Sequence, residues 1–179
     1  MPRSLQEDWK ALFISGKASD VSFVIGDEII PAHKSVLIAR VPFFDKMFAS
    51  GMSEAESGVV KIDDDAVDAA TYKECLQFIY TDILPSNLDE NAASLLPLAD
   101  KYDLPVLRGA CEAALKKGLL KENVCQLLIL ADLFHCSSLK ESCLRHIKTW
   151  GKSLDKSTMD NLKPYPDLLI EVITSYHHH

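Results

Sequence analysis

The sequence predicts an α+β fold, in which a small β-sheet is flanked by helical hairpins and followed by further helices. A short segment around Val21, Phe23 and Ile25 alternates apolar residues with smaller or less apolar ones, which is typical of a β-strand with one buried face. From about residue 67 onward, apolar residues recur at helical spacing. Strand and helix segments do not alternate regularly, which argues against a parallel α/β sheet.

An amphipathic helix is predicted first, over residues 5–15. Ser4 with Glu7 three positions later forms a capping-box pattern, and Gly16 ends the helix. Its apolar residues recur at helical spacing: Leu5, Trp9, Leu12 and Phe13.

The next segment predicts a β-hairpin and two short helices. Gly26-Asp27 is a turn signal between two strands, and Pro31 is expected to end the second strand. Helices are predicted over residues 33–40 and 42–50, and a third strand over 59–62.

The remaining chain predicts helices with identifiable start signals. We expect Asp65 and Asp103 to cap two of them, and Ser138 with Glu141 to form a second capping box. The predicted ranges are about 65–79, 87–102, 103–117, 122–134, 139–150 and 166–176. The joint at Lys116-Lys117-Gly118 divides the chain into a domain of residues 1–118 and a helical extension of residues 119–176.

The charge balance argues against a nucleic-acid-binding function. The 179 residues have a formal net charge of −7, whereas nucleic-acid binders need a basic surface to displace counterions. We also expect no membrane span, because the chain has no run of about 18 apolar residues.

Cysteine usage predicts a reducing compartment. The five cysteines lie mostly within apolar helical patterns, as buried thiols do. The residues after Met1 lack the apolar core of a secretory leader, so we expect the cytoplasm or the nucleus. Residues 177–179, three histidines, resemble a purification tag and are excluded.

We expect no enzyme activity and no cofactor. The sequence contains no phosphate-binding loop, dinucleotide fingerprint or nucleophile elbow. The acidic run at residues 63–65 lacks the ligand spacing of a calcium loop and favours a solvated turn with a helix cap.

Two groups of polar residues are candidate sites. His135, Cys136, Cys143 and His146, with Cys125, suit zinc by type but lack paired ligand spacing, so no metal site is expected. A second group has no activated Ser or Cys beside it. We expect it to be a structural polar cluster that holds a strand to a helix start: Asp20, His33 and Lys34.

Five ordered motifs resemble the signature of the BTB/POZ family. They are the segments at residues 20–23, 30–37, 43–48, 78–82 and 98–102. The resemblance covers about residues 5–117 and implies a non-catalytic protein-interaction module.

Within that family, the chain is most similar to speckle-type POZ proteins and related cullin-3 adaptors. Residues 123–133 and 139–144 resemble the helical pair called the 3-box, and the helices beyond residue 153 resemble a partial BACK extension. This resemblance implies a dimeric substrate adaptor of a cullin-3 RING ubiquitin ligase.

The resemblance implies a homodimer formed through the first helix and the helix after Ala32-His33-Lys34. From the residues alone, the apolar stripe of the first helix packs either on its own domain or on a second copy. The implied interface residues are Leu5, Trp9, Leu12 and Val36.

The resemblance also implies a contact with the N-terminal domain of cullin-3. Cullin-binding relatives have a hydrophobic-x-Glu motif after the Phe-rich helix, and Met52-Ser53-Glu54 matches it. Without the resemblance, these three residues favour an ordinary surface loop. The other implied contact residues are Phe48, Asp82, Lys101, Tyr102, Leu128, Ile129 and His135.

The sequence departs from the family pattern in two ways, and two other functions are possible for a chain of this family. Val41 stands where the family usually has Ser, and no MATH, Kelch, ankyrin or zinc-finger segment is recognised. We therefore expect the substrate protein to bind through a region that is not in this chain. The alternatives are a BTB-type transcriptional regulator that recruits corepressors through the dimer, and a channel-type tetramerisation domain. The latter resembles the core but lacks the leading amphipathic helix.

Overall fold

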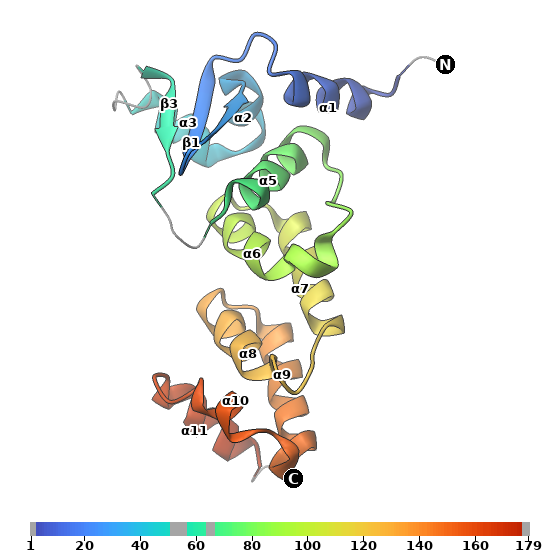
Figure 1. Ribbon diagram of the computed structural model, residues 1–179, viewed down its shortest axis with the longest axis vertical. Helices are drawn as coiled ribbons and strands as arrows, with labels where there is room; N and C mark the ends of the chain where they lie inside the picture. Colours follow the sequence, from blue (N-terminus) through green and yellow to red (C-terminus); the bar gives the residue numbers. More distant parts are fainter. Residues whose placement is uncertain (1–2, 51–56, 64–66, 177–179) are drawn as a thin grey trace. The chain divides into compact units, whose positions relative to one another are not determined.

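The computed structural model describes residues 3–50, 57–63 and 67–176 (Figure 1). It divides into two compact units. Unit 1 comprises Met1–Asn87 with Pro97–Leu107, and unit 2 comprises Leu88–Leu96 with Arg108–His179. The predicted α+β class is confirmed, because unit 1 contains a three-stranded sheet among helices.

Helix α1 (Leu5–Ser15) has the predicted ends. The Ser4 hydroxyl accepts a hydrogen bond from the Glu7 backbone N–H at 3.2 Å, and the Glu7 carboxylate accepts one from the Ser4 backbone N–H at 2.6 Å. Gly16 follows with φ 59°, and a Cβ there would lie 2.8 Å from Cγ of Pro31. Both the left-handed backbone and the close approach of Pro31 therefore require glycine.

The sheet has the strand order β2-β1-β3. Strand β1 (Val21–Ile25) pairs antiparallel with β2 (Glu28–Ala32) and parallel with β3 (Val59–Lys61). The prediction that Pro31 ends the second strand was wrong, since β2 continues through Pro31, opposite Ser22, to Ala32. An edge strand tolerates proline because one side of it needs no backbone donor.

Helices α2 (Lys34–Arg40) and α3 (Pro42–Ala49) follow the hairpin as predicted. Helix α5 (Ala69–Thr81) begins later than expected. Its N-cap is Asp68, whose carboxylate accepts a hydrogen bond from the Thr71 backbone N–H at 2.8 Å. Asp65 lies outside the described residues, and Asp68 occupies the cap position that was predicted for it.

Helices α6 (Leu88–Lys101) and α7 (Pro105–Lys117) each contribute residues to both units. The prediction that Asp103 caps α7 was wrong. Asp103 has φ 50° and its backbone N–H donates to the Asp100 carbonyl, so it belongs to the turn that ends α6. A residue in that left-handed turn does not have the extended backbone of an N-cap.

Aromatic rings form the centre of unit 1. Phe23 of β1 lies 5.2 Å from Tyr72 and 5.8 Å from Phe44, between ring centroids. Phe44 in turn stacks on Tyr102 at 4.9 Å. The Tyr72 and Tyr102 hydroxyls are 2.5 Å apart, so each phenol has a partner in the core.

Unit 2 is helical. Its elements after α7 are α8 (Val124–Leu133), α9 (Ser137–Trp150), a 3₁₀ turn (Gly151–Ser153), α10 (Lys156–Asp160) and α11 (Pro166–Ser175). Among the described helices of both units, none has the length and apolar character that crossing a membrane requires.

The predicted Ser138–Glu141 capping box was wrong. Helix α9 begins at Ser137, its N-cap is Cys136, and no side chain caps it. His135 has φ 52°, and the Cys136 backbone N–H donates to the Ala131 carbonyl at 2.8 Å. This tight ending of α8 determines where α9 starts, so Ser138 lies inside the helix.

Candidate protein-interaction site

The predicted polar cluster joins strand β2, helix α2 and helix α5. Both the backbone N–H and Nδ1 of His33 lie 2.8 Å from the Tyr80 hydroxyl. His33 Nε2 lies 2.8 Å from the Lys17 carbonyl oxygen, which can only accept, so Nε2 is the donor. Burial raises the pKa of Tyr80 to about 12 and keeps its hydroxyl protonated.

Asp20 completes this cluster at the start of α2. Its carboxylate accepts a hydrogen bond from the Lys34 backbone N–H at 2.7 Å. His33, the N-cap of α2, makes no side-chain cap bond. Asp20, which is 14 residues before Lys34 in the sequence, instead accepts a hydrogen bond from a backbone N–H in the first turn of the helix. These hydrogen bonds hold the end of β2 and the start of α2 against α5, which is a structural role.

Replacing Tyr80 with phenylalanine is expected to destabilise unit 1 by about 1–3 kcal/mol. The substitution leaves the buried backbone N–H of His33 without its acceptor. Denaturant unfolding at fixed protein concentration measures the change. Tyr165→Phe, at an exposed tyrosine in unit 2, is the matched control. Equal midpoints for the two variants would contradict the structural role of Tyr80.

A hollow of about 390 Å³ lies beside α1. Three of the predicted dimer residues line it, namely Leu5, Trp9 and Val36, and Leu5 is 72% exposed. Leu12 is half-buried on the same stripe of α1. Asp82, which the sequence grouped with the cullin-facing residues, also lines this hollow.

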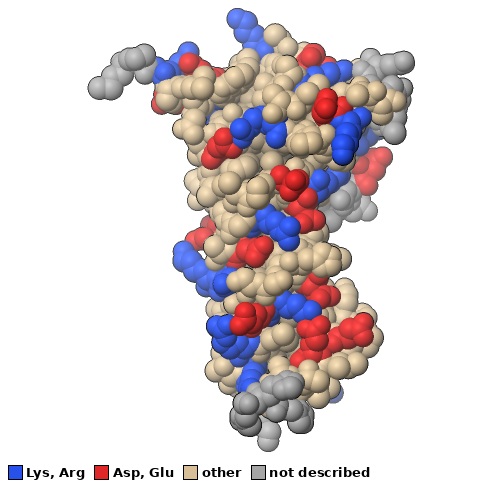
Figure 2. Space-filling model, turned by 180° about the vertical axis from the view of Figure 1, so that it is seen from behind, with Lys and Arg blue, Asp and Glu red and all other residues tan. Residues whose placement is uncertain are grey.

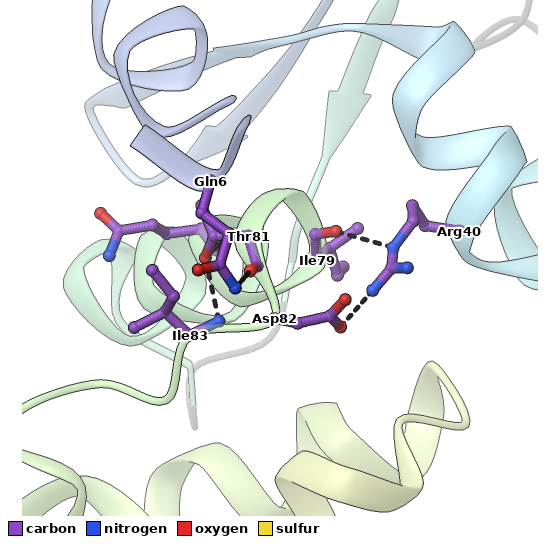
Figure 3. A network of polar contacts seen from close by, with 7 residues as sticks. Gln6, Arg40, Ile79, Thr81, Asp82 and Ile83 are labelled. Atoms are coloured by element: carbon purple, nitrogen blue, oxygen red, sulfur yellow. Dashed lines mark hydrogen bonds and ion pairs between the residues drawn. The ribbon is translucent and has the colours of Figure 1, made fainter. Parts of the chain in front are cut away.

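A polar network anchors the floor of this hollow at the C-terminal end of α5 (Figure 3). The Gln6 amide donates to the Thr81 carbonyl at 3.1 Å, and Arg40 Nε donates to the Ile79 carbonyl at 3.1 Å. Arg40 also forms an ion pair with Asp82. Helices α1 and α2 thereby bind carbonyls that α5 leaves without helical partners. Sequence reasoning missed Gln6 and Arg40, whose roles depend on this tertiary contact.

The ends of α3 and α6 meet on another part of unit 1. Phe44 stacks on Phe48 at 6.1 Å and on Tyr102 at 4.9 Å, between ring centroids. The Lys34 ammonium lies 5.2 Å from the Phe48 ring centroid, and the Lys101 ammonium lies 5.6 Å from that of Tyr102. Phe48 and Tyr102, two of the predicted cullin-facing residues, are therefore joined through Phe44, and a third, Lys101, lies against the Tyr102 ring.

A second hollow, of about 510 Å³, lies between α3, β3 and the end of α6. Its floor includes the rings of Phe23, Phe43, Phe44 and Tyr102. Tyr102 itself is buried, so it contributes only the edge of its ring to this floor, and its hydroxyl is hydrogen-bonded to that of Tyr72. Met52, Ser53 and Glu54 lie outside the described residues.

The predicted residues of the helical extension differ in accessibility. Leu128 is 0% exposed and belongs to the core of unit 2. Ile129 is half-buried and His135 is exposed. Only the last two present side-chain surface to a partner.

The five cysteines are buried, and none of them forms a disulfide bond. Burial raises the pKa of both Cys111 and Cys143 to about 12, so these thiols are protonated at neutral pH. Nδ1 of His146 lies 2.8 Å from the Ser142 carbonyl within its own helix. Among the described residues, His, Cys, Asp and Glu side chains form no cluster of three or more that could hold a metal ion.

Both hollows in unit 1 combine an apolar floor with polar or charged groups at the edge, as protein-binding surfaces do. Surfaces of this kind favour a protein-interaction module. Residues 9–119 match the family model of the BTB/POZ domain. The chain belongs to the BTB/POZ family, whose domains typically dimerise and mediate protein interactions.

Proposed function

We propose that this chain is a dimeric adaptor that binds the N-terminal domain of cullin-3 in a RING ubiquitin ligase. The main support is the convergence of Phe48 and Tyr102 on the Phe44 ring, with Lys101 against the Tyr102 ring. Phe48 and Tyr102, which the family resemblance assigns to one contact, are far apart in sequence but share the Phe44 ring as a neighbour. Tyr102 is buried and would support the contact from within, whereas Lys101 beside it is exposed. The Met52-Ser53-Glu54 motif follows α3 directly in the chain.

The helical extension supports the same function. Helices α8 and α9 follow the BTB/POZ domain where cullin-3 adaptors have their 3-box. We assign Ile129 and His135 to an extended contact, because both have accessible side chains. Leu128 is left out, because a fully buried side chain has no surface to offer.

The dimer contact belongs to this proposal too. Leu5, Trp9 and Val36 line one hollow, and Leu12 is half-buried on the same stripe of α1 as Leu5 and Trp9. A helix with such an apolar stripe, largely uncovered at Leu5, gains stability by burying it against a second copy. A two-fold symmetric interface is the commonest solution.

Met52→Asp and Glu54→Lys are each expected to weaken binding to the cullin-3 N-terminal domain by at least about tenfold, or ~1.4 kcal/mol. An aspartate removes the apolar anchor, and a lysine reverses the charge that fixes the register. Titration calorimetry with the full chain measures the affinity, and light scattering confirms that the dimer persists.

Ile29→Asp and Glu28→Lys are matched controls, since both residues are exposed near the tip of the β1–β2 hairpin. They should bind like the wild type. Wild-type affinity in both motif variants would refute the assigned contact. A dimer that does not bind cullin-3 at all would refute the adaptor function and favour the corepressor-recruiting alternative.

A further inference from the structure

We propose that the hollow between α3, β3 and α6 binds an acidic partner segment that inserts an apolar side chain. This inference rests on the proposed function, because the segment would belong to the cullin that binds this surface. It adds the chemistry of that partner, and it assigns roles to Lys46 and Lys61.

The floor of the hollow suits an apolar anchor. Phe43 lies with its ring centroid 5.4 Å from that of Tyr102 and is 39% exposed, although its ring packs on the core. Met47 of α3 and Ile62 after β3 are both half-buried along the same hollow. The flexible Met47 thioether, beside the partly exposed Phe43 ring, can adapt to an inserted apolar side chain.

The charged residues that line the hollow are all lysines within the described part of the chain. Lys46 comes from α3, Lys61 from β3 and Lys101 from the end of α6, and all three side chains are exposed. The chain as a whole has a net charge of −7. Figure 2 shows basic and acidic side chains interspersed over the face that it presents, so a lining with lysines alone differs from that surface.

A favourable interaction with the helix dipole can explain the positions of only two of these three lysines. Lys46 and Lys101 lie in the last turns of their helices, where a cation favours the helix dipole. Lys61 lies on a strand, which has no such dipole. A shared role toward an anionic partner explains all three positions, since cations around one hollow attract and orient acidic residues.

The test compares the triple variant Lys46→Glu, Lys61→Glu, Lys101→Glu with the charge-matched variant Lys121→Glu, Lys156→Glu, Lys163→Glu. The control lysines are exposed residues of unit 2. Stopped-flow association with the cullin-3 N-terminal domain is measured at low and high salt. We expect about a tenfold slower association for the hollow variant at low salt, because rim charges act mainly on the association rate. The difference should shrink at high salt, where screening is strong.

A second measurement uses the full chain without cullin. The probe is 8-anilinonaphthalene-1-sulfonate, which joins apolar rings to a fixed negative charge. We expect the hollow variant to bind the dye at least about fivefold more weakly than the wild type, and the control variant to match the wild type.

The outcomes separate the two proposals. Equal association rates for the two triple variants, or equal dye affinities, would overturn the acidic-partner inference while the adaptor function stands. A wild-type chain that binds the dye through these lysines but not cullin-3 would refute the adaptor function and support the chemistry of the hollow. Circular dichroism confirms that both variants remain folded.

Discussion

Replacing Phe44 with alanine is expected to destabilise unit 1 by about 3–5 kcal/mol, as for other fully buried phenylalanines. Phe44 is 0% exposed, and its ring lies within 6.1 Å of the rings of Phe23, Phe48 and Tyr102, between centroids. Its removal leaves a cavity between the sheet and two helices. The neighbouring rings cannot fill that cavity without leaving their own contacts.

The measurement requires a probe of unit 1 alone. The chain has two tryptophans, with Trp9 in unit 1 and Trp150 in unit 2. A Trp150→Phe background therefore makes Trp9 fluorescence a reporter of unit 1 during denaturant unfolding. Protein concentration is held fixed because association shifts apparent stability.

Phe43→Ala is the matched control for Phe44→Ala, since the two residues are adjacent on α3 but Phe43 is 39% exposed. It should lower the free energy of unfolding by clearly less. Equal losses from the two substitutions would contradict the role of Phe44 as the centre of the aromatic core. Phe44→Ala should also weaken the proposed binding to cullin-3, because Phe48 and Tyr102 are positioned through its ring.

Local signals predicted most of the fold. Ser4, Glu7 and Gly16 determine the ends of α1 because a cap depends on residues within one turn of the helix end. Predictions failed where two candidates competed or where a neighbouring turn intervened. Asp68 caps α5 because its carboxylate reaches Thr71. Ser138 does not cap α9, because the turn that ends α8 makes α9 begin at Ser137 and so puts Ser138 inside the helix.

The candidate site was less predictable because it depends on contacts between distant segments. A family motif could indicate Phe48 and Tyr102, but periodicity could not show that Phe44 joins them. Lys46 and Lys61 appear unremarkable in the sequence, and only the fold places them around one hollow with Lys101.

The surroundings of Asp82 also depend on a contact between distant segments. Its motif lies beside other family landmarks, which grouped it with the cullin-facing residues. In the structure it forms an ion pair with Arg40 in the hollow beside α1. Both side chains are substantially exposed, so the pair itself contributes little stability. The ion pair instead holds the Arg40 side chain at the edge of the hollow beside α1, which is the surface proposed for the dimer.

Replacing both Leu5 and Val36 with aspartate is expected to convert the proposed dimer into monomers at micromolar concentration. Both residues line the hollow beside α1, and Leu5 is 72% exposed in the single chain. Aspartates here are solvated in the monomer but would be buried without partners in the dimer. A two-fold interface contains each substitution twice, so the dissociation constant should rise by roughly a hundredfold or more. Light scattering across a concentration series measures the change.

Ile14→Asp is the control that separates the interface from a general effect of charge on α1. Ile14 lies nine residues after Leu5, about 180° around the helix, and is 63% exposed. The stripe of Leu5, Trp9 and Leu12 spans a narrow arc on the other side, so Ile14→Asp should remain dimeric. Dissociation by Ile14→Asp, or a persistent dimer in the Leu5 and Val36 variant, would place the interface elsewhere. The Phe48–Phe44–Tyr102 contacts involve neither substituted residue. A monomeric variant should therefore still bind the cullin-3 domain, one cullin for each chain.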